Sequence, residues 1–176
     1  MRKYALLGTI LGAMALPGAA LAATNADIVT SIDKALANLA SQQNADGSWN
    51  YGGYNQAVTG AAVSAFLSQQ SLWGSNAAAY QAVVDNGMNY LLGTATLSAV
   101  STRLDGSSAC PGGAASCTGA YWYGAGETTY TTGLVAQAIA QDGALKGAGS
   151  VATLTGPLAG LTWGQISQGV VNVYTA

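Results

Sequence analysis

The sequence predicts an all-α fold of paired helices, and two observations lead to that prediction. Two similar segments read WNYGGYNQAVTGAAVSAFLSQQ from Trp49 and WYGAGETTYTTGLVAQAIAQ from Trp122. Apolar residues at helical spacing flank both segments. A period of tens of residues is typical of stacked supersecondary units rather than one irregular globule. About two and a half units fit the chain, at residues 27–70, 76–141 and a shortened 162–176.

The first 22 residues predict a secretory signal peptide. Arg2 and Lys3 precede an apolar run from Tyr4 to Leu16, and Ala20-Leu21-Ala22 offers a small-residue cleavage site. The alternative is a membrane anchor, but the run is shorter than the roughly 20 residues that a membrane span needs. We expect cleavage after Ala22, a secreted or periplasmic location, and no transmembrane segment in the mature domain, residues 23–176.

Three stretches carry a single apolar stripe, as a helix with one covered face does. In 27–43 the stripe holds Ile28, Ile32, Leu36 and Leu39, and Thr24 or Asn25 is the expected N-cap. We expect similar helices at 76–92 and 162–174. Residues 57–70 and 129–141 are apolar or small on nearly every side. These two stretches therefore predict helices that are covered on both faces.

Two stretches between these helices predict loops. Residues 94–120 hold about 21 residues more than the matching part of the first unit, and an insertion of this kind maps to a surface loop. Residues 143–160 are interrupted by glycine and proline. The only cysteines, Cys110 and Cys117, lie in the first loop, and export makes a disulfide the expected state. A metal site is the alternative, but it needs more ligands, and the chain has no histidine.

The charge balance excludes several classes of partner. Without Arg2 and Lys3, three bases oppose seven acids, which gives a net charge of −4. Nucleic acid binding requires clustered Lys or Arg, so we expect no nucleic acid partner. Half of the residues are hydrophobic, which excludes a disordered chain.

The motif that ends the first predicted helix resembles a known repeat. The pattern Leu39-x-x-Gln42-Gln43-x-x-Asp46-Gly47-Ser48-Trp49 resembles the Gln–Trp repeat of squalene and oxidosqualene cyclases. It is also similar to repeats in protein prenyltransferase β subunits. The second copy departs from it, because Thr94 and Ala95 stand near the place of the glutamine pair. A simpler interpretation is that Trp49 and Trp122 are large buried packing residues.

The resemblance implies an α-α toroid, in which paired helices form an inner and an outer ring. This chain would then be a partial toroid whose last outer helix, 162–174, lacks its inner partner, as in a piece of a longer protein. The inner helices of an open ring would expose apolar faces, so we expect self-association. The expected function is that of an exported, non-catalytic binding or scaffold module for an apolar small-molecule ligand. The alternative is the N-terminal part of a cyclase-like or prenyltransferase-like enzyme whose catalytic residues lie in downstream repeats.

The sequence contains no recognisable catalytic motif. It has no Asp-x-Asp-Asp cluster, no histidine for zinc or for a Ser-His-Asp triad, and no phosphate-binding Gly-Lys-Ser/Thr loop. We therefore expect no metal and no cofactor. Glu127, in GAGETTY, is a weak candidate for a catalytic acid. The alternative is a carboxylate placed by the dipole of the following helix. Asp46 and Asp105, each before glycine, predict turns.

Overall fold

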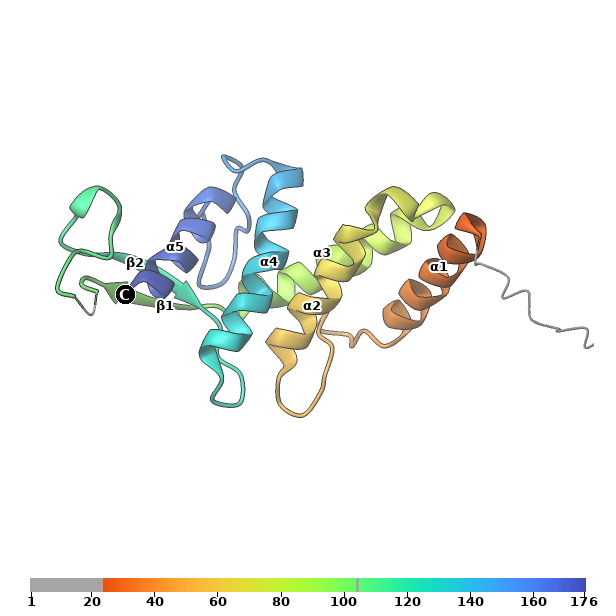
Figure 1. Cartoon of the computed structure of the whole chain (residues 1–176), viewed down its shortest axis with the longest axis horizontal. Coiled ribbons are helices and arrows are strands. Elements are labelled where there is room, and N and C mark those ends of the chain that lie inside the picture. The colour runs from red at the N-terminus through yellow and green to blue at the C-terminus, as the bar shows by residue number, and fades with distance from the viewer. Residues whose placement is uncertain (1–23, 104) are drawn as a thin grey trace, which may run out of the picture.

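The computed structural model describes residues 24–103 and 105–176. The predicted signal peptide lies outside these residues. The described part is mostly helical, as the sequence predicts, and it forms an elongated row (Figure 1). Helix α1 lies at one end of the row, and helix α5 and a β hairpin lie at the other. No helix in this part combines the length and the apolar character needed to cross a bilayer.

Three helices alternate along the chain with two others. Helix α1 spans Asn25–Ser41, α3 spans Ala77–Gly93 and α5 spans Trp163–Thr175, all within two residues of the expected bounds. Thr24 and Thr162 precede α1 and α5. Each threonine hydroxyl accepts a hydrogen bond from the third helical N–H in a capping box, which sets the start of the helix.

Helices α2 and α4 lie side by side and run parallel (Figure 1). Helix α2 spans Asn55–Ser68 and α4 spans Thr128–Lys146. In the second turn of each helix, a Cβ on Gly60 would lie only 2.9 Å from the carbonyl oxygen of Leu134. At the end of α2, its last residue, Ser68, accepts a hydrogen bond at its hydroxyl from the Gln141 side chain of α4. The glycine thus lets the two backbones approach closely, with matching ends together.

The hydrophobic core lies between α2, α3, α4 and α5. Its largest fully buried side chains are Trp122, Phe66, Met88, Leu91, Ile139, Leu158 and Ile166. Helix α1 buries only Leu36. Polar contacts also hold α1, because the Asp33 carboxylate accepts hydrogen bonds from the Tyr80 hydroxyl at 2.9 Å and from the Asn76 amide at 3.0 Å. The outer end of the row is therefore fastened partly by hydrogen bonds.

The segment 94–120, expected to be a loop, contains an antiparallel β hairpin, so the loop prediction is wrong there, while the mostly helical chain stays compatible with the all-α prediction. Strand β1 spans Thr96–Val100 and β2 spans Cys117–Tyr121, with Thr96 opposite Tyr121. Helix α5 covers β2. A Cβ on Gly119 would clash with Val173 of that helix. The absence of a side chain at Gly119 is thus what lets α5 contact the strand.

Helix α4 is longer than expected. It continues past the predicted end at residue 141 to Lys146, so the expected loop at 143–160 begins later. Gly143 does not end the helix, because it is buried against the Trp163 side chain, where a Cβ would lie 3.1 Å away. The i,i+4 ion pair between Asp142 and Lys146 spans this position. Tertiary packing therefore outweighs the low helix propensity of glycine.

Candidate functional site

Trp49 and Trp122 make matching contacts and are anchors between helices. The Trp49 indole N–H donates to the carbonyl of Leu39 in α1 at 2.8 Å, and that of Trp122 donates to Leu91 in α3 at 2.6 Å. Each tryptophan backbone N–H also donates to the hydroxyl of a threonine ten residues later, at 3.0 Å in both cases. The exposed fractions are 3% and 0%, so neither ring is open to a ligand.

The turn between α1 and α2 is closed by Gln43. Its amide donates to the carbonyls of Val83 in α3 at 2.9 Å and of Gly47 at 3.0 Å. Gln42 is exposed and only ends α1 through its backbone N–H. Gly47 has a φ of +86°, and a Cβ there would clash with the Asn86 carbonyl. Of the two glutamines, Gln43 is therefore the one that joins the turn to the neighbouring helix.

Asp46 and Asp105 lie in two turns of the same construction. The Asp46 carboxylate accepts from the backbone N–H of Ser48 at 2.9 Å and from its hydroxyl at 2.7 Å. Asp105 accepts from Ser107 at the same two distances. These hydrogen bonds hold the pKa of both carboxyls below the ordinary value. Carboxylates bound in this way to their own turns stabilise the turns.

Glu127 lies at the start of α4 and faces a groove. It is exposed, and its carboxylate does not cap the helix. Across residues 24–103 and 105–176 this carboxylate has no hydrogen bond and no ion pair. The groove has a volume of about 460 Å³ and is also lined by Tyr51, Tyr54, Val58 and Tyr130. Glu127 is thus a free carboxylate among three tyrosines.

The tyrosines come from the starts of the two parallel helices. Tyr54 precedes α2 and Tyr130 lies in the first turn of α4; their ring centroids are 6.3 Å apart, with the planes at 89°. Tyr51 is 76% exposed and Tyr130 is 57% exposed. Contiguous exposed apolar surface often marks a binding site. The groove is the strongest candidate site in the described part of the chain.

Two turns of the same shape support the groove. Gly53 and Gly126 both have a φ of +87°, and the residues before them, Gly52 and Ala125, have φ values of +58° and +46°. A Cβ on Gly53 would lie 3.8 Å from that of Ala125, so the turns are in contact. Ala125 is the one non-glycine residue with positive φ among the described residues. Strain of this kind collects at functional sites.

Sequence reasoning selected Glu127 but missed the tyrosines around it. A signal was present, because YGGY before α2 and TTY at the start of α4 flank the two glycine-rich turns. That signal gains meaning only when α2 and α4 are known to be parallel. Tyr54 and Tyr130 are far apart in the sequence, and the packing of the two helices brings them together.

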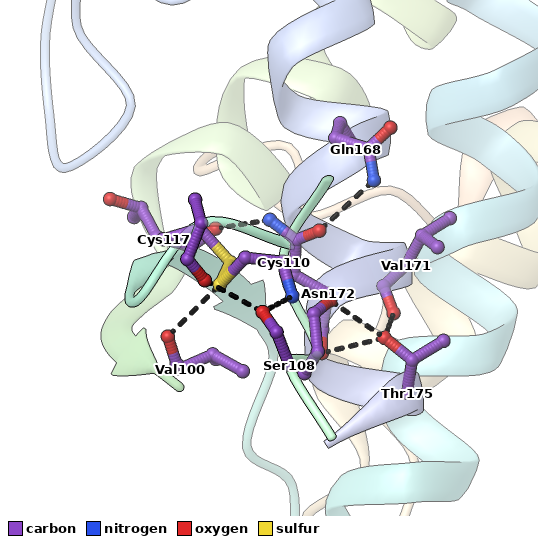
Figure 2. Close-up of a disulfide and its surroundings, with 11 residues drawn as sticks. Val100, Ser108, Cys110, Cys117, Gln168, Val171, Asn172 and Thr175 are labelled. Carbon is purple, nitrogen blue, oxygen red and sulfur yellow. Dashed lines mark hydrogen bonds between the residues drawn. A yellow bond between two sulfur atoms is a disulfide. The ribbon is translucent and has the colours of Figure 1, made fainter. Parts of the chain in front are cut away.

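A second cluster surrounds the disulfide between Cys110 and Cys117, which confirms the predicted bond (Figure 2). The Cα atoms are 5.6 Å apart, and the Cys110 sulfur lies 3.2 Å from the Val100 carbonyl oxygen. The buried Asn172 of α5 donates to the Thr118 carbonyl at 2.9 Å. The bond thus closes a loop beside the strand that α5 covers. A disulfide fits an oxidising compartment outside the cytoplasm.

A charged cluster joins the end of α4 to α3. Lys146 pairs with Asp142 at 2.9 Å and with Asp85 at 3.1 Å, and its ammonium lies 5.6 Å from the centre of the Trp163 ring. The Asp142 side chain is 1% exposed, and this burial raises its pKa although Lys146 acts in the opposite direction. Burial lowers the Lys146 pKa, but hydrogen bonds and charges of Asp142 and Asp85 outweigh it and raise the pKa. The cluster joins two helices.

Among the described residues, no three Cys, Asp or Glu side chains lie close enough together to hold a metal ion. No protein-family model matches the chain, and comparison with curated proteins and with solved structures gives no match either. The resemblance to cyclase and prenyltransferase repeats therefore rests on the sequence motifs alone.

Proposed function

We propose that this chain is an exported, non-catalytic binding module that holds an apolar small-molecule ligand in the groove between Tyr54 and Tyr130. The observation that most strongly supports this proposal is that the starts of two parallel helices, with the turn before α2, bring three tyrosines to one groove of about 460 Å³. Ligand pockets of roughly 300–1,000 Å³ lined by aromatic side chains are the usual size and composition for small molecules. The predicted signal peptide and the disulfide support a secreted or periplasmic location.

The arrangement of the helices supports the proposal of a partial α-α toroid. Helices α2 and α4 take the place of inner helices, since they are parallel neighbours. Buried residues surround much of α2, whereas those of α4 lie on one face, so the expectation that 129–141 is covered on both faces is wrong. Helices α1, α3 and α5 take the place of outer helices. The matched contacts of Trp49 and Trp122 favour two units of one design. In this proposal the groove lies where the inner helices begin.

A binding role is favoured over catalysis because Glu127 is exposed. The groove places no second carboxylate, amine, thiol or aliphatic hydroxyl beside Glu127, since its other lining residues are three tyrosines and Val58. The carboxylate is better suited to contact a ligand than to transfer a proton.

Binding of Nile red, a neutral apolar dye, tests the proposal on the exported chain with its disulfide intact. We expect the dye to bind, and the double variant Tyr54→Ala/Tyr130→Ala to weaken binding by about tenfold, the effect of removing two aromatic contacts. Tyr123→Ala is the matched control, because Tyr123 is 60% exposed but does not line the groove. Equal affinity of the double variant and the wild type would contradict the proposal.

The apolar side chains at the two ends of the row also predict self-association. Apolar side chains are exposed at both ends of the row, with Ile28 at 48% and Val29 at 40% on α1 and Val171 at 51% on α5. Exposed apolar patches drive association. Light scattering after size exclusion should show dimers or larger species that increase with concentration. A monomer at every concentration would contradict this prediction.

A further inference from the structure

We propose that the groove binds an organic cation of the quaternary ammonium class. This inference rests on the proposed function, because it names the ligand class of the same groove. It depends on the geometry of the tyrosine rings, on the free carboxylate of Glu127, and on the size of the groove.

The tyrosine rings supply the first part of the argument. Tyr54 and Tyr130 stand at 89° to each other, so their rings form two walls at a corner, and Tyr51 lies exposed beside them. The face of an aromatic ring carries partial negative charge and attracts a cation within about 6 Å. Cages of several rings are the usual way in which proteins bind methylated ammonium groups.

Charge supplies the second part. The N-terminal ends of α2 and α4 lie together and would attract an anion, but the Glu127 carboxylate at the start of α4 opposes one. No base lines the groove. Of the three bases in the mature sequence, Lys146 is paired with Asp85 and Asp142. The net charge, −2 for the whole chain and −4 without Arg2 and Lys3, also attracts cations to the protein. A ligand that carries a positive charge is therefore favoured over one that carries a negative charge.

The cost of removing water from the cation distinguishes a primary ammonium from a quaternary ammonium. A primary ammonium such as that of lysine is strongly hydrated and needs acceptors to replace its water. In the groove, the side-chain acceptors are the Glu127 carboxylate and the tyrosine hydroxyls. A quaternary ammonium has no N–H to satisfy, and its methyl groups contact rings directly. The volume of about 460 Å³ holds such a group together with its substituent.

Titration with choline and with 3,3-dimethylbutan-1-ol tests the inference. The two molecules have nearly the same shape, but the alcohol has a neutral carbon in place of the ammonium nitrogen. Calorimetry or NMR shift titration on the exported chain should show choline binding at least about fivefold more tightly, the factor of a partly desolvated cation–π contact. Glu127→Gln should remove about fivefold of choline affinity and leave the alcohol unchanged.

Ring variants separate cation–π attraction from simple packing. Tyr130→Phe keeps the π face and should keep choline affinity, whereas Tyr130→Leu should lose most of the preference for choline. Tyr123→Leu is the control for an exposed tyrosine outside the groove. If Tyr130→Leu fails to fold, Glu127→Gln still decides the question, because Glu127 is exposed and makes no contact that the fold needs.

The outcomes distinguish this inference from the proposed function. Equal affinities for choline and the alcohol, with Nile red binding that depends on Tyr54 and Tyr130, would overturn the cation and leave an apolar binding module. If choline does not bind, and if Nile red binds the groove variants as tightly as the wild type, both the cation inference and the proposed function are overturned. A choline preference that survives Glu127→Gln and Tyr130→Leu together would place the cation elsewhere and also overturn the inference.

Discussion

The indole N–H of Trp122 donates to the carbonyl oxygen of Leu91, which lies 31 residues earlier in the chain. Trp49 makes the same bond to Leu39, only ten residues earlier. The ring therefore reaches the same place at the end of the preceding helix although the second connection is much longer. The β hairpin takes up the extra residues without moving the anchor.

Removing the threonine hydroxyl behind either tryptophan should destabilise the fold. Thr59 and Thr132 are buried, and each accepts the backbone N–H of its tryptophan. Thr59→Val or Thr132→Val leaves that buried N–H unpaired, which costs about 1–3 kcal/mol of unfolding free energy. Urea denaturation measures the loss, and Thr59→Ser, which keeps the hydroxyl, should lose less. Similar values for the Val and Ser variants would show that the hydrogen bond is unimportant.

The two neighbouring glutamines should respond differently to alanine. Gln43→Ala removes the bonds to Val83 and Gly47 and should lower the free energy of unfolding by about 1–3 kcal/mol. Gln42→Ala changes an exposed side chain and should stay within about 0.5 kcal/mol of the wild type. Chemical denaturation of both variants gives the comparison. A larger loss for Gln42→Ala would contradict the assignment of Gln43 as the link.

The two glycine-rich turns allow a matched test of backbone strain. Gly52→Ala places a Cβ at a φ of +58°, where only the Tyr54 side chain is near, and should cost about 1 kcal/mol. Ala125→Gly relieves a positive φ in the other turn, so it should be neutral or stabilising. Thermal unfolding measures both. Destabilisation by Ala125→Gly as large as that by Gly52→Ala would show that the alanine is not strained.

Loss of the disulfide should destabilise the protein, with the largest local effect at the hairpin. Replacing Cys110 and Cys117 by Ser should lower stability by about 2.5 kcal/mol in the chain-entropy model for a loop of this length. On loss of the disulfide, hydrogen exchange of the α5 amides beside β2 should increase more, relative to the wild type, than hydrogen exchange of the α1 amides. The exported wild type should take up no thiol reagent before reduction. Uptake at both cysteines would show that the bond is absent in solution.

Neutralising the buried Asp142 should change how stability depends on pH. Burial raises its folded-state pKa above the usual 3.8, so the folded state holds its proton at pH values where the unfolded state has lost it. Stability from this group therefore rises as the pH falls through the folded pKa toward 3.8. Because asparagine does not titrate, the difference in unfolding free energy, Asp142→Asn minus wild type, should be larger at pH 7 than at pH 4. Urea titrations at the two pH values measure it, and a difference that grows on acidification would refute the direction.

The helices could be predicted from the sequence because each has a local signal. Apolar spacing marks α1, α3 and α5, and Thr24 caps α1 as expected. The hairpin could not be predicted in this way, because its strands, TLSAV and CTGAY, are short and rich in small residues. Strand β2 is also stabilised by α5, which comes from a distant part of the chain. The end of α4 was missed for the same reason, since Gly143 is held in the helix by Trp163.

The candidate site was predictable only in part. Glu127 stands out as an acid in a glycine-rich stretch, so sequence reasoning finds it. The partners of Glu127 come from another turn, and only the parallel packing of α2 and α4 at Gly60 brings Tyr54 to Tyr130. Long-range juxtaposition of this kind is not encoded in local periodicity.

The hairpin leaves the row of helices at Thr96 and returns directly opposite, at Tyr121. The turn at 103–107, beyond the two paired strands, can change in length while the row keeps its spacing, because each doubling of a flexible loop costs only about 0.6 kcal/mol. The turn between Thr102 and Ser108 is therefore a natural insertion point. An epitope or a small reporter domain placed there would be displayed beyond the helices, while the tryptophan anchors and the tyrosine groove keep their places.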